Sequence, residues 1–253
     1  MRADSSLRER LKSRQVLLGC FLTWPTGGVI ELLALAEFDF LVLDCEHGFF
    51  SIESVAAMVT AGDAAGLPAI VRAPSAASDQ VGRYLDAGAA GTLFPRVESA
   101  EQAQQALDRV KFPPEGKRGL AGVRANRYGA EPLGRFVREA NEKTLVAIQI
   151  ETAGALADLE AIASLPGLDV LFVGPNDLTQ ALGIPGQYED PRYRAAVERI
   201  ARAAAQAGKT AGIMLSQREQ IPALSALGFR FLTTSDRTLV LDSARRWREA
   251  LSR

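Results

Sequence analysis

The chain has 253 residues, of which 47% are hydrophobic, and a formal net charge of −1 from 29 basic and 30 acidic residues. This balance argues against nucleic acid as a partner, because proteins that bind nucleic acid usually carry a basic excess or patch. No apolar run reaches the roughly 18 residues of a membrane span, and the N-terminus lacks a signal-peptide core, so we expect a cytoplasmic protein without a membrane partner. Two cysteines, Cys20 and Cys45, are too few for a disulfide framework and lack the spacing of a structural zinc site.

Short apolar runs alternate with amphipathic helical segments along the chain, as in a parallel sheet buried on both faces. Eight such units in about 250 residues predict one (β/α)8 TIM barrel domain over residues 1–253. We expect strands at 16–23, 38–44, 68–72, 91–95, 145–151, 169–173, 210–214 and 229–233. Helices are expected at 28–36, 52–65, 79–87, 100–110, 155–164, 192–207, 219–227 and 239–251.

A doubly wound open sheet is the alternative fold. It would call for a glycine-rich phosphate loop after an early strand, and the sequence contains no G-x-G-x-x-G motif. The longest irregular stretch, 112–141, is expected to include a short helix over 133–140. Loops of this length inside a compact domain usually have a function.

The only histidine, His47, follows the expected second strand in the run Asp44-Cys45-Glu46-His47. A lone histidine often has only a structural role. Imidazole, however, is the side chain whose ordinary pKa lies near neutrality. Its position beside Asp44 and Glu46 at a strand end therefore favours a catalytic site.

Polar residues also follow other expected strands, and in such a barrel the strand ends form the active site. Arg72 ends the third strand, and Gln149 and Glu151 end the fifth, where a spacing of two points both side chains to one side. Each of these could be an ordinary solvated residue at a strand end. Their convergence on one rim favours a site, to which the sixth strand adds Gly174, Pro175, Asn176 and Asp177.

Glu151 and Asp177 are oxygen ligands of the kind that Mg²⁺ or Mn²⁺ prefers, and two protein ligands leave positions open for substrate. Arg72, the only cation expected at the strand ends, suits a carboxylate or a developing oxyanion. His47 is the candidate acid/base. Of the five lysines, only Lys117 is expected to reach the site, so a metal is favoured over a Schiff base as the electrophile.

These motifs resemble the HpcH/HpaI class II pyruvate-dependent aldolases, a family that includes 4-hydroxy-2-oxoheptanedioate and 2-dehydro-3-deoxyglucarate aldolases. The resemblance runs from Gly19 to the C-terminal helix. It is carried by Asp44-Cys45-Glu46-His47-Gly48, Arg72 with Pro74, Gln149-Ile150-Glu151-Thr152, Val173-Gly174-Pro175-Asn176-Asp177-Leu178 and the loop 118–129.

The resemblance implies reversible cleavage of a 4-hydroxy-2-oxo acid to pyruvate and an aldehyde, through a metal-bound pyruvate enolate. It implies a homohexamer whose last helix is exchanged between subunits. By this resemblance, Glu151 and Asp177 bind Mg²⁺, Mn²⁺ or Co²⁺, and Arg72 stabilises the enolate. His47 is the acid/base, oriented by Asp44 and by Asp86 of a neighbouring subunit, and Gln149, Gly174, Pro175 and Asn176 hold the pyruvate.

The chain departs from the family pattern at two positions, since many members have alanine at Asn176 and tryptophan at Phe21. Related chemistry stays open as an alternative, namely oxaloacetate decarboxylation or cleavage of a CoA thioester, as in citrate lyase or malyl-CoA lyase. A non-catalytic barrel that binds an oxo acid is the alternative outside enzymes.

Overall fold

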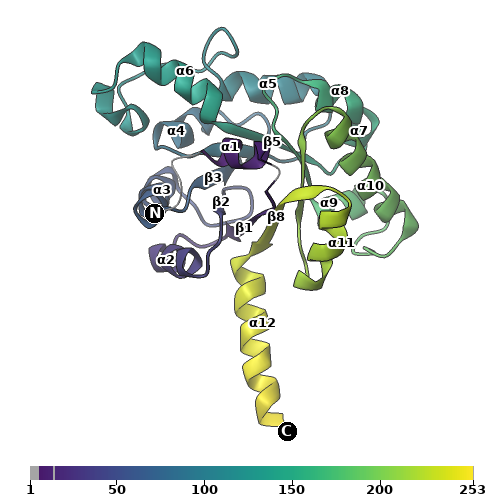
Figure 1. The fold of residues 1–253 in the computed structure, drawn as a ribbon. Coiled ribbons are helices and arrows are strands. Elements are labelled where there is room, and N and C mark those ends of the chain that lie inside the picture. The colour runs from purple at the N-terminus through teal and green to yellow at the C-terminus, as the bar shows by residue number, and fades with distance from the viewer. Residues whose placement is uncertain (1–5, 14, 253) are drawn as a thin grey trace.

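Eight parallel strands close into a barrel in which each strand pairs with its neighbours in chain order and β1 pairs with β8 (Figure 1). The computed structural model describes residues 6–13 and 15–252, so residues 1–5, on which the signal-peptide expectation depends, lie outside it. Helices surround the barrel, and the predicted (β/α)8 fold is confirmed. The strands are β1 Leu17–Leu22, β2 Phe40–Asp44, β3 Ala69–Arg72, β4 Gly91–Phe94, β5 Leu145–Ile150, β6 Val170–Val173, β7 Thr210–Met214 and β8 Phe229–Ser235.

The helices that connect the strands lie close to the predicted ranges. The predicted helix 155–164 is two shorter helices, and the C-terminal helix begins earlier, at Asp236. These helices are α2 Gly27–Leu35, α3 Ile52–Ala65, α4 Val81–Asp86, α5 Ala100–Val110, α7 Ala153–Ala157, α8 Leu159–Ser164, α10 Pro191–Gln206, α11 Ile221–Ala226 and α12 Asp236–Glu249. Beyond the eight predicted units lie α1 Leu7–Lys12, α6 Leu133–Lys143, α9 Pro175–Ala181 and the 3-10 turns η1 Arg124–Gly129, η2 Arg218–Gln220 and η3 Ala250–Ser252.

Alternation along the strands separates a core inside the barrel from a core between strands and helices. In β2, Phe40 and Val42 belong to the inner core, whereas Leu41 and Leu43 belong to the outer one. Because successive side chains point to opposite faces of a strand, Asp44 continues the inner series. An acidic side chain therefore stands inside the barrel where β2 ends.

The same alternation places two polar residues at the end of β5. Leu145 and Ala147 lie in the inner core, so Gln149 and then Glu151 follow on the inner side. Both are almost completely buried, at 2% and 1% exposure. The carboxyl end of the barrel is therefore lined by polar groups above an apolar interior.

The opposite end of the barrel is closed by segments remote from these residues. Leu7 and Leu11 of α1 are buried in the inner core. The long segment between α5 and β5 lies at this end as well, because α5 runs back from the carboxyl end. The buried Lys111 Nζ holds the segment's two ends together by donating to the carbonyl oxygens of Asn141 and Thr144 at 2.7 and 2.9 Å. The short helix predicted within it is confirmed as α6.

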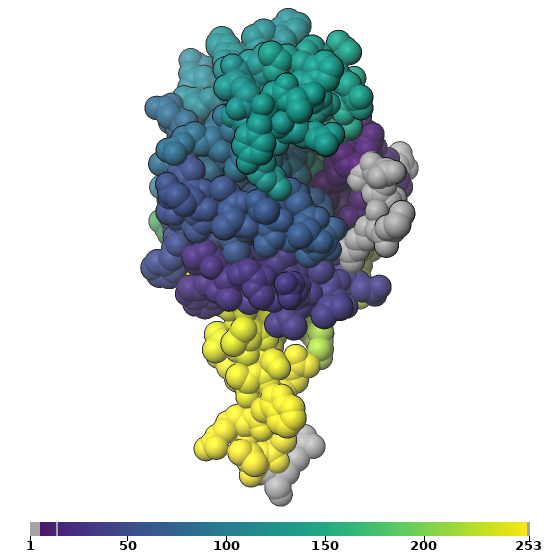
Figure 2. Space-filling model, turned by 90° about the vertical axis from the view of Figure 1, so that its left-hand side faces the viewer, coloured from purple at the N-terminus to yellow at the C-terminus, as the bar shows by residue number. Residues whose placement is uncertain are grey.

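Helix α12 projects from the barrel as a separate rod, drawn in yellow in Figures 1 and 2. Its first residue is fixed, since the Asp236 carboxylate accepts hydrogen bonds from the Thr23 backbone N–H at 2.7 Å and from the Thr23 hydroxyl at 3.1 Å. Farther along, Val240, Trp247 and Leu251 are 63%, 78% and 77% exposed. Across the part of the chain that the structure describes, no helix is both long and apolar enough to cross a membrane.

Candidate active site

Asp44 and Arg72 are register partners on β2 and β3, so their side chains leave the two strands side by side. Arg72 donates from Nε to Asp44 Oδ1 at 2.9 Å and from Nη2 to Asp44 Oδ2 at 2.6 Å. Asp44 Oδ1 also accepts the backbone N–H groups of Glu46 and His47 at 3.1 and 3.0 Å. Burial raises the pKa of Asp44, but the hydrogen bonds and charge of Arg72 outweigh it and hold this pKa below its ordinary value.

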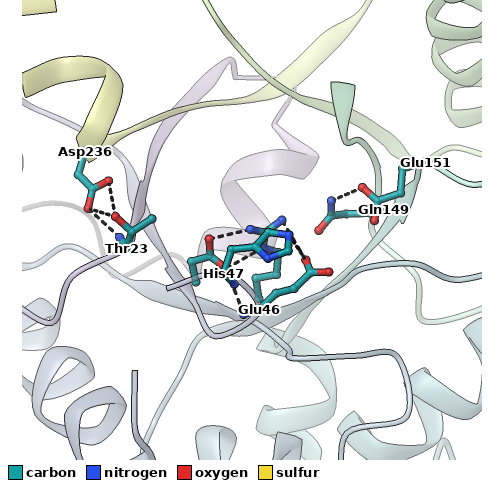
Figure 3. Close-up of polar contacts among 8 residues, drawn as sticks. Thr23, Glu46, His47, Gln149, Glu151 and Asp236 are labelled. Carbon is teal, nitrogen blue, oxygen red and sulfur yellow. Dashed lines mark hydrogen bonds and ion pairs between the residues drawn. The ribbon is translucent and has the colours of Figure 1, made fainter. Parts of the chain in front are cut away.

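A second carboxylate, Glu46, faces the same guanidinium. Its Oε2 lies 3.1 Å from Arg72 Nη1 and 3.8 Å from His47 Nε2. Burial raises the pKa of Glu46, with Arg72 and then His47 acting against that rise. Figure 3 shows Glu46 and His47 together, between the Gln149–Glu151 pair on one side and the Thr23–Asp236 pair on the other.

These contacts correct the orientation expected for His47. The Asp44 carboxylate binds the backbone N–H of His47, and both of its oxygens are taken by Arg72. The acid beside the imidazole is Glu46. The imidazole itself is 60% exposed, so it is free to meet a substrate or a water.

The aromatic ring of Phe21 packs against the guanidinium of Arg72. The Arg72 Cζ atom lies 5.1 Å from the centre of the Phe21 ring, within the range of a cation–π contact. Phe21 is 1% exposed and belongs to the inner core. At this departure from the family pattern, the chain thus keeps an aromatic face under the cation.

On the other side of the barrel mouth, Gln149 and Glu151 lie side by side as their spacing predicts. Gln149 Nε2 donates to Glu151 Oε2 at 2.6 Å, and the backbone N–H of Arg96 donates to Glu151 Oε1 at 2.8 Å. A Cβ at Gly174 would lie 1.9 Å from Glu151 Oε2, so a larger residue at position 174 would displace this carboxylate from its present position. The Gln149 Oε1 atom is buried without a hydrogen-bond partner among the described residues.

Asp177 stands in the first turn of α9, a helix with proline at its first position. Its side chain is 36% exposed, and its Oδ1 atom lies 3.9 Å from Arg96 Nη1. Burial raises the pKa of Glu151 to about 7, and the negative charges of Asp177 and Glu46 add to that rise against the Arg96 hydrogen bond. A cation placed between Glu151 and Asp177 would offset both the burial of the Glu151 charge and its repulsion by the neighbouring carboxylates.

The donors at this position fit a divalent metal. Two carboxylates offer hard oxygen ligands, and the unpartnered Gln149 Oε1 adds an acceptor beside them. Within residues 6–13 and 15–252, no group of three or more His, Cys, Asp or Glu side chains is arranged to hold a metal. A metal here would therefore keep several positions for water or substrate.

The strand ends open into a cavity of about 680 Å³. Asn176, at its wall, accepts a hydrogen bond at Oδ1 from the Tyr188 hydroxyl at 2.6 Å. Nearly all of the predicted site residues line this one cavity, namely Asp44, His47, Arg72, Gln149, Glu151, Gly174, Pro175, Asn176 and Asp177.

Asp86 does not share this cavity. It ends α4 and accepts a hydrogen bond from Arg118 Nη2 at 2.7 Å. A helix that follows a barrel strand ends at the barrel's amino end, so Asp86 is remote from its own chain's site. Its expected role in a neighbouring subunit's site stays a prediction.

Two further residues of the site were not among those predicted. Arg96, just after β4, binds Glu151 through its backbone and approaches Asp177, so the expectation that Arg72 is the only cation at the strand ends is wrong. The same reading of strand ends, applied to Phe94-Pro95-Arg96, would have found it. Glu46, the sequence neighbour of His47, is the second, since its carboxylate contacts both Arg72 and the imidazole.

The expectation that Lys117 could reach the site is also wrong. Its Nζ atom binds Asp108 Oδ2 at 2.5 Å, near the end of α5 and hence at the opposite end of the barrel. The cavity lining contains no lysine among the described residues.

The fold and site define a (β/α)8 barrel with an arginine–carboxylate cluster and a pair of oxygen ligands at its carboxyl end. The chain belongs to the HpcH/HpaI aldolase/citrate lyase family, whose model matches residues 17–234. It is 39% identical to a hydroxypyruvate/pyruvate aldolase of Paraburkholderia phytofirmans, with 89% of each chain covered. It is 35% identical to a 4-hydroxy-2-oxovalerate aldolase of Novosphingobium aromaticivorans, with 98% and 96% covered. An HpcH/HpaI aldolase/citrate lyase family protein of Burkholderia cenocepacia has a similar structure, with a TM-score of 0.91, 34% identity and 98% and 99% covered.

The buried charge of Glu151 predicts a pH-dependent cost in stability when no metal is bound. In the folded chain the pKa of Glu151 is about 7, above its ordinary value of 4.5. Protonated Glu151 therefore contributes fully to the stability of the folded state below its ordinary pKa of 4.5. This contribution is lost as the pH rises through the folded-state pKa of about 7. Glu151→Gln should be more stable than wild type near pH 8, and the difference should shrink by about 1–3 kcal/mol towards pH 5.

Urea unfolding with a chelator at both pH values measures this difference. The amide is compatible with the site, because Gln149 can turn its unpartnered Oε1 towards it. Glu249→Gln, at an exposed acid of α12, is the control and should show no such trend. A difference between Glu151→Gln and wild type that does not change with pH would contradict the assignment.

Proposed function

We propose that the protein is a divalent-metal-dependent aldolase that reversibly cleaves a 4-hydroxy-2-oxo acid to pyruvate and an aldehyde. One observation carries the proposal: Glu151, which forms no ion pair within the described residues, lies with Asp177 across one cavity from a fixed arginine. Membership of the family agrees with this reading, as do the names of the two curated relatives.

In this proposal, Glu151 and Asp177 hold Mg²⁺, Mn²⁺ or Co²⁺. When bound, the metal would act as a Lewis acid on the 2-oxo acid end of the substrate. Gln149 and the turn from Gly174 to Asn176 border the same position and would hold the pyruvate part.

Arg72 would stabilise negative charge that develops on the substrate oxygens. A guanidinium has five N–H donors. In Arg72, two of them bind Asp44 and a third faces Glu46. The remaining donors are held in place by these contacts and by Phe21, so they need little reorganisation during the reaction.

His47 would take the proton from the 4-hydroxyl group as the bond between C3 and C4 breaks. Its exposure at the cavity and its nearness to Glu46 suit a group that gains positive charge in this step. The same enolate chemistry is compatible with oxaloacetate decarboxylation or cleavage of a CoA thioester. We place these, and a non-catalytic oxo-acid-binding barrel, behind the aldolase, because no further feature of the site favours them.

Metal removal tests the mechanism. A chelator should abolish pyruvate release from 4-hydroxy-2-oxo acids, and Mg²⁺, Mn²⁺ or Co²⁺ should restore it. Borohydride treatment with pyruvate should leave the protein mass unchanged, since no lysine of the described chain lines the cavity. Glu151→Gln should lose the increase in melting temperature that metal gives the wild type. A borohydride-stable pyruvyl adduct on any lysine would overturn the metal mechanism.

His47→Ala and Arg72→Ala should fail in different ways. A positioned acid/base is typically worth about 10²–10⁴-fold, and water can partly replace His47, so some aldol cleavage should survive. Loss of one fixed electrostatic donor typically costs about 10²–10³-fold, and Arg72→Ala should suppress both cleavage and exchange of the pyruvate methyl protons in D₂O. Metal binding should persist in His47→Ala. Proton exchange at the wild-type rate in Arg72→Ala would reject its role at the enolate.

We further propose that the protein is a homo-oligomer, with a hexamer as the expected form. The positions of Val240, Trp247 and Leu251 place them on one face of α12 and its final turn, and none of the residues that the structure describes covers this apolar face. Sedimentation should show a species larger than 27.1 kDa. Val240→Glu with Trp247→Glu should shift it to monomer, whereas Arg245→Ala, on another face, should not. A wild-type monomer at micromolar concentration would contradict the proposal.

A further inference from the structure

Arg96 is in contact with both carboxylates of the proposed metal site. Its backbone N–H donates to Glu151 Oε1 at 2.8 Å, and its Nη1 atom lies 3.9 Å from Asp177 Oδ1. Within residues 6–13 and 15–252, Asp177 forms no other ion pair. One residue therefore meets the two ligands through different groups, the first through a neutral N–H and the second through a positive charge.

The backbone of Arg96 is held in place, whereas its side chain faces solvent. Pro95 and Val97 on either side are buried, and the Val97 carbonyl oxygen accepts a hydrogen bond from the Thr152 hydroxyl at 2.8 Å. Arg96 itself has a φ of 53°, which is uncommon for a residue other than glycine, and its side chain is 64% exposed. The fixed backbone therefore keeps an exposed guanidinium close to Asp177.

A guanidinium and a divalent cation compete for the same carboxylate. The contact between Arg96 and Asp177 is weak, because 3.9 Å exceeds the length of a hydrogen bond and the guanidinium is solvated. A metal at Asp177 would therefore displace the side chain without breaking a strong interaction. Arginine stays protonated in proteins, however, so its charge would remain near the metal and repel it.

We infer that Arg96 is an internal competitor that lowers the affinity of Glu151 and Asp177 for a divalent metal. The inference rests on the proposed function, in which these two carboxylates are the metal ligands. Without metal, the guanidinium partly balances the negative charge of Asp177. With metal, the same positive charge opposes the ion, although Arg96 is no ligand because a guanidinium has no acceptor atom. The site would therefore release its metal more readily than the two carboxylates alone.

Calorimetric titration with Mn²⁺ in the absence of substrate tests this. Arg96→Met removes the charge but keeps a long side chain on the same backbone. At low salt it should bind Mn²⁺ about 3–10-fold more tightly than the wild type, because neither competition nor repulsion remains. Arg96→Lys keeps a positive charge and should bind Mn²⁺ within about twofold of the wild type. Added salt should reduce the difference between Arg96→Met and the wild type, because this side chain is exposed.

Arg138→Met is the matched control, since it removes the same charge from an exposed arginine of α6, at the opposite end of the barrel. It should leave the affinity for Mn²⁺ unchanged. Mere damage to the site would weaken binding, so an Arg96→Met variant that binds Mn²⁺ no more tightly than the wild type would overturn the inference. An Arg96→Lys variant as tight as Arg96→Met would do the same, and both results would leave the aldolase proposal intact. A wild type that binds none of Mn²⁺, Mg²⁺ and Co²⁺ would overturn the metal-dependent function and the inference with it.

Discussion

The hydrogen bonds that converge on Asp44 organise one half of the site. This carboxylate lies inside the barrel because it continues the inward series of β2, and its register partner on β3 is Arg72. It orders the turn that carries Glu46 and His47 through two backbone N–H groups, and it fixes the guanidinium through two more donors. Since the carboxylate is buried and kept ionised by its partners, it holds His47 and Arg72 in a fixed arrangement relative to each other.

In the other half of the site, around Glu151, the buried negative charge is not paired with an arginine side chain. Glu151 is buried beside further negative charges, and its hydrogen bonds come from two neutral donors, the Gln149 amide at 2.6 Å and the Arg96 backbone N–H at 2.8 Å. Such a buried charge is costly without a counter-ion, and the metal that we propose between Glu151 and Asp177 would supply one. The barrel mouth thus combines the paired charges of Asp44, Glu46 and Arg72 with the charge of Glu151, which has no ion-pair partner among the described residues.

Periodicity predicted most of the fold and the greater part of the site. The apolar runs located the eight strands, and the two-residue spacing of Gln149 and Glu151 placed both side chains on the inner face. The contact of Glu46 with the imidazole could not be predicted, because it depends on Arg72 taking both oxygens of Asp44. The hydrogen bond from the Arg96 backbone to Glu151 could not be predicted from the sequence either. Arg96 adopts a φ of 53°, which is uncommon for a residue other than glycine, and in this conformation its N–H donates to Glu151.

Gly174 gives the site a constraint that sequence variation must respect. Because the end of the Glu151 side chain fills the space that a Cβ would need, a larger residue at position 174 would move this carboxylate. Such a shift would alter the hydrogen bond between Gln149 and Glu151 and the position of Glu151 relative to Asp177. The place that the acid at the end of β5 takes in the cavity therefore depends on the neighbouring strand, at a residue that contributes no side chain of its own.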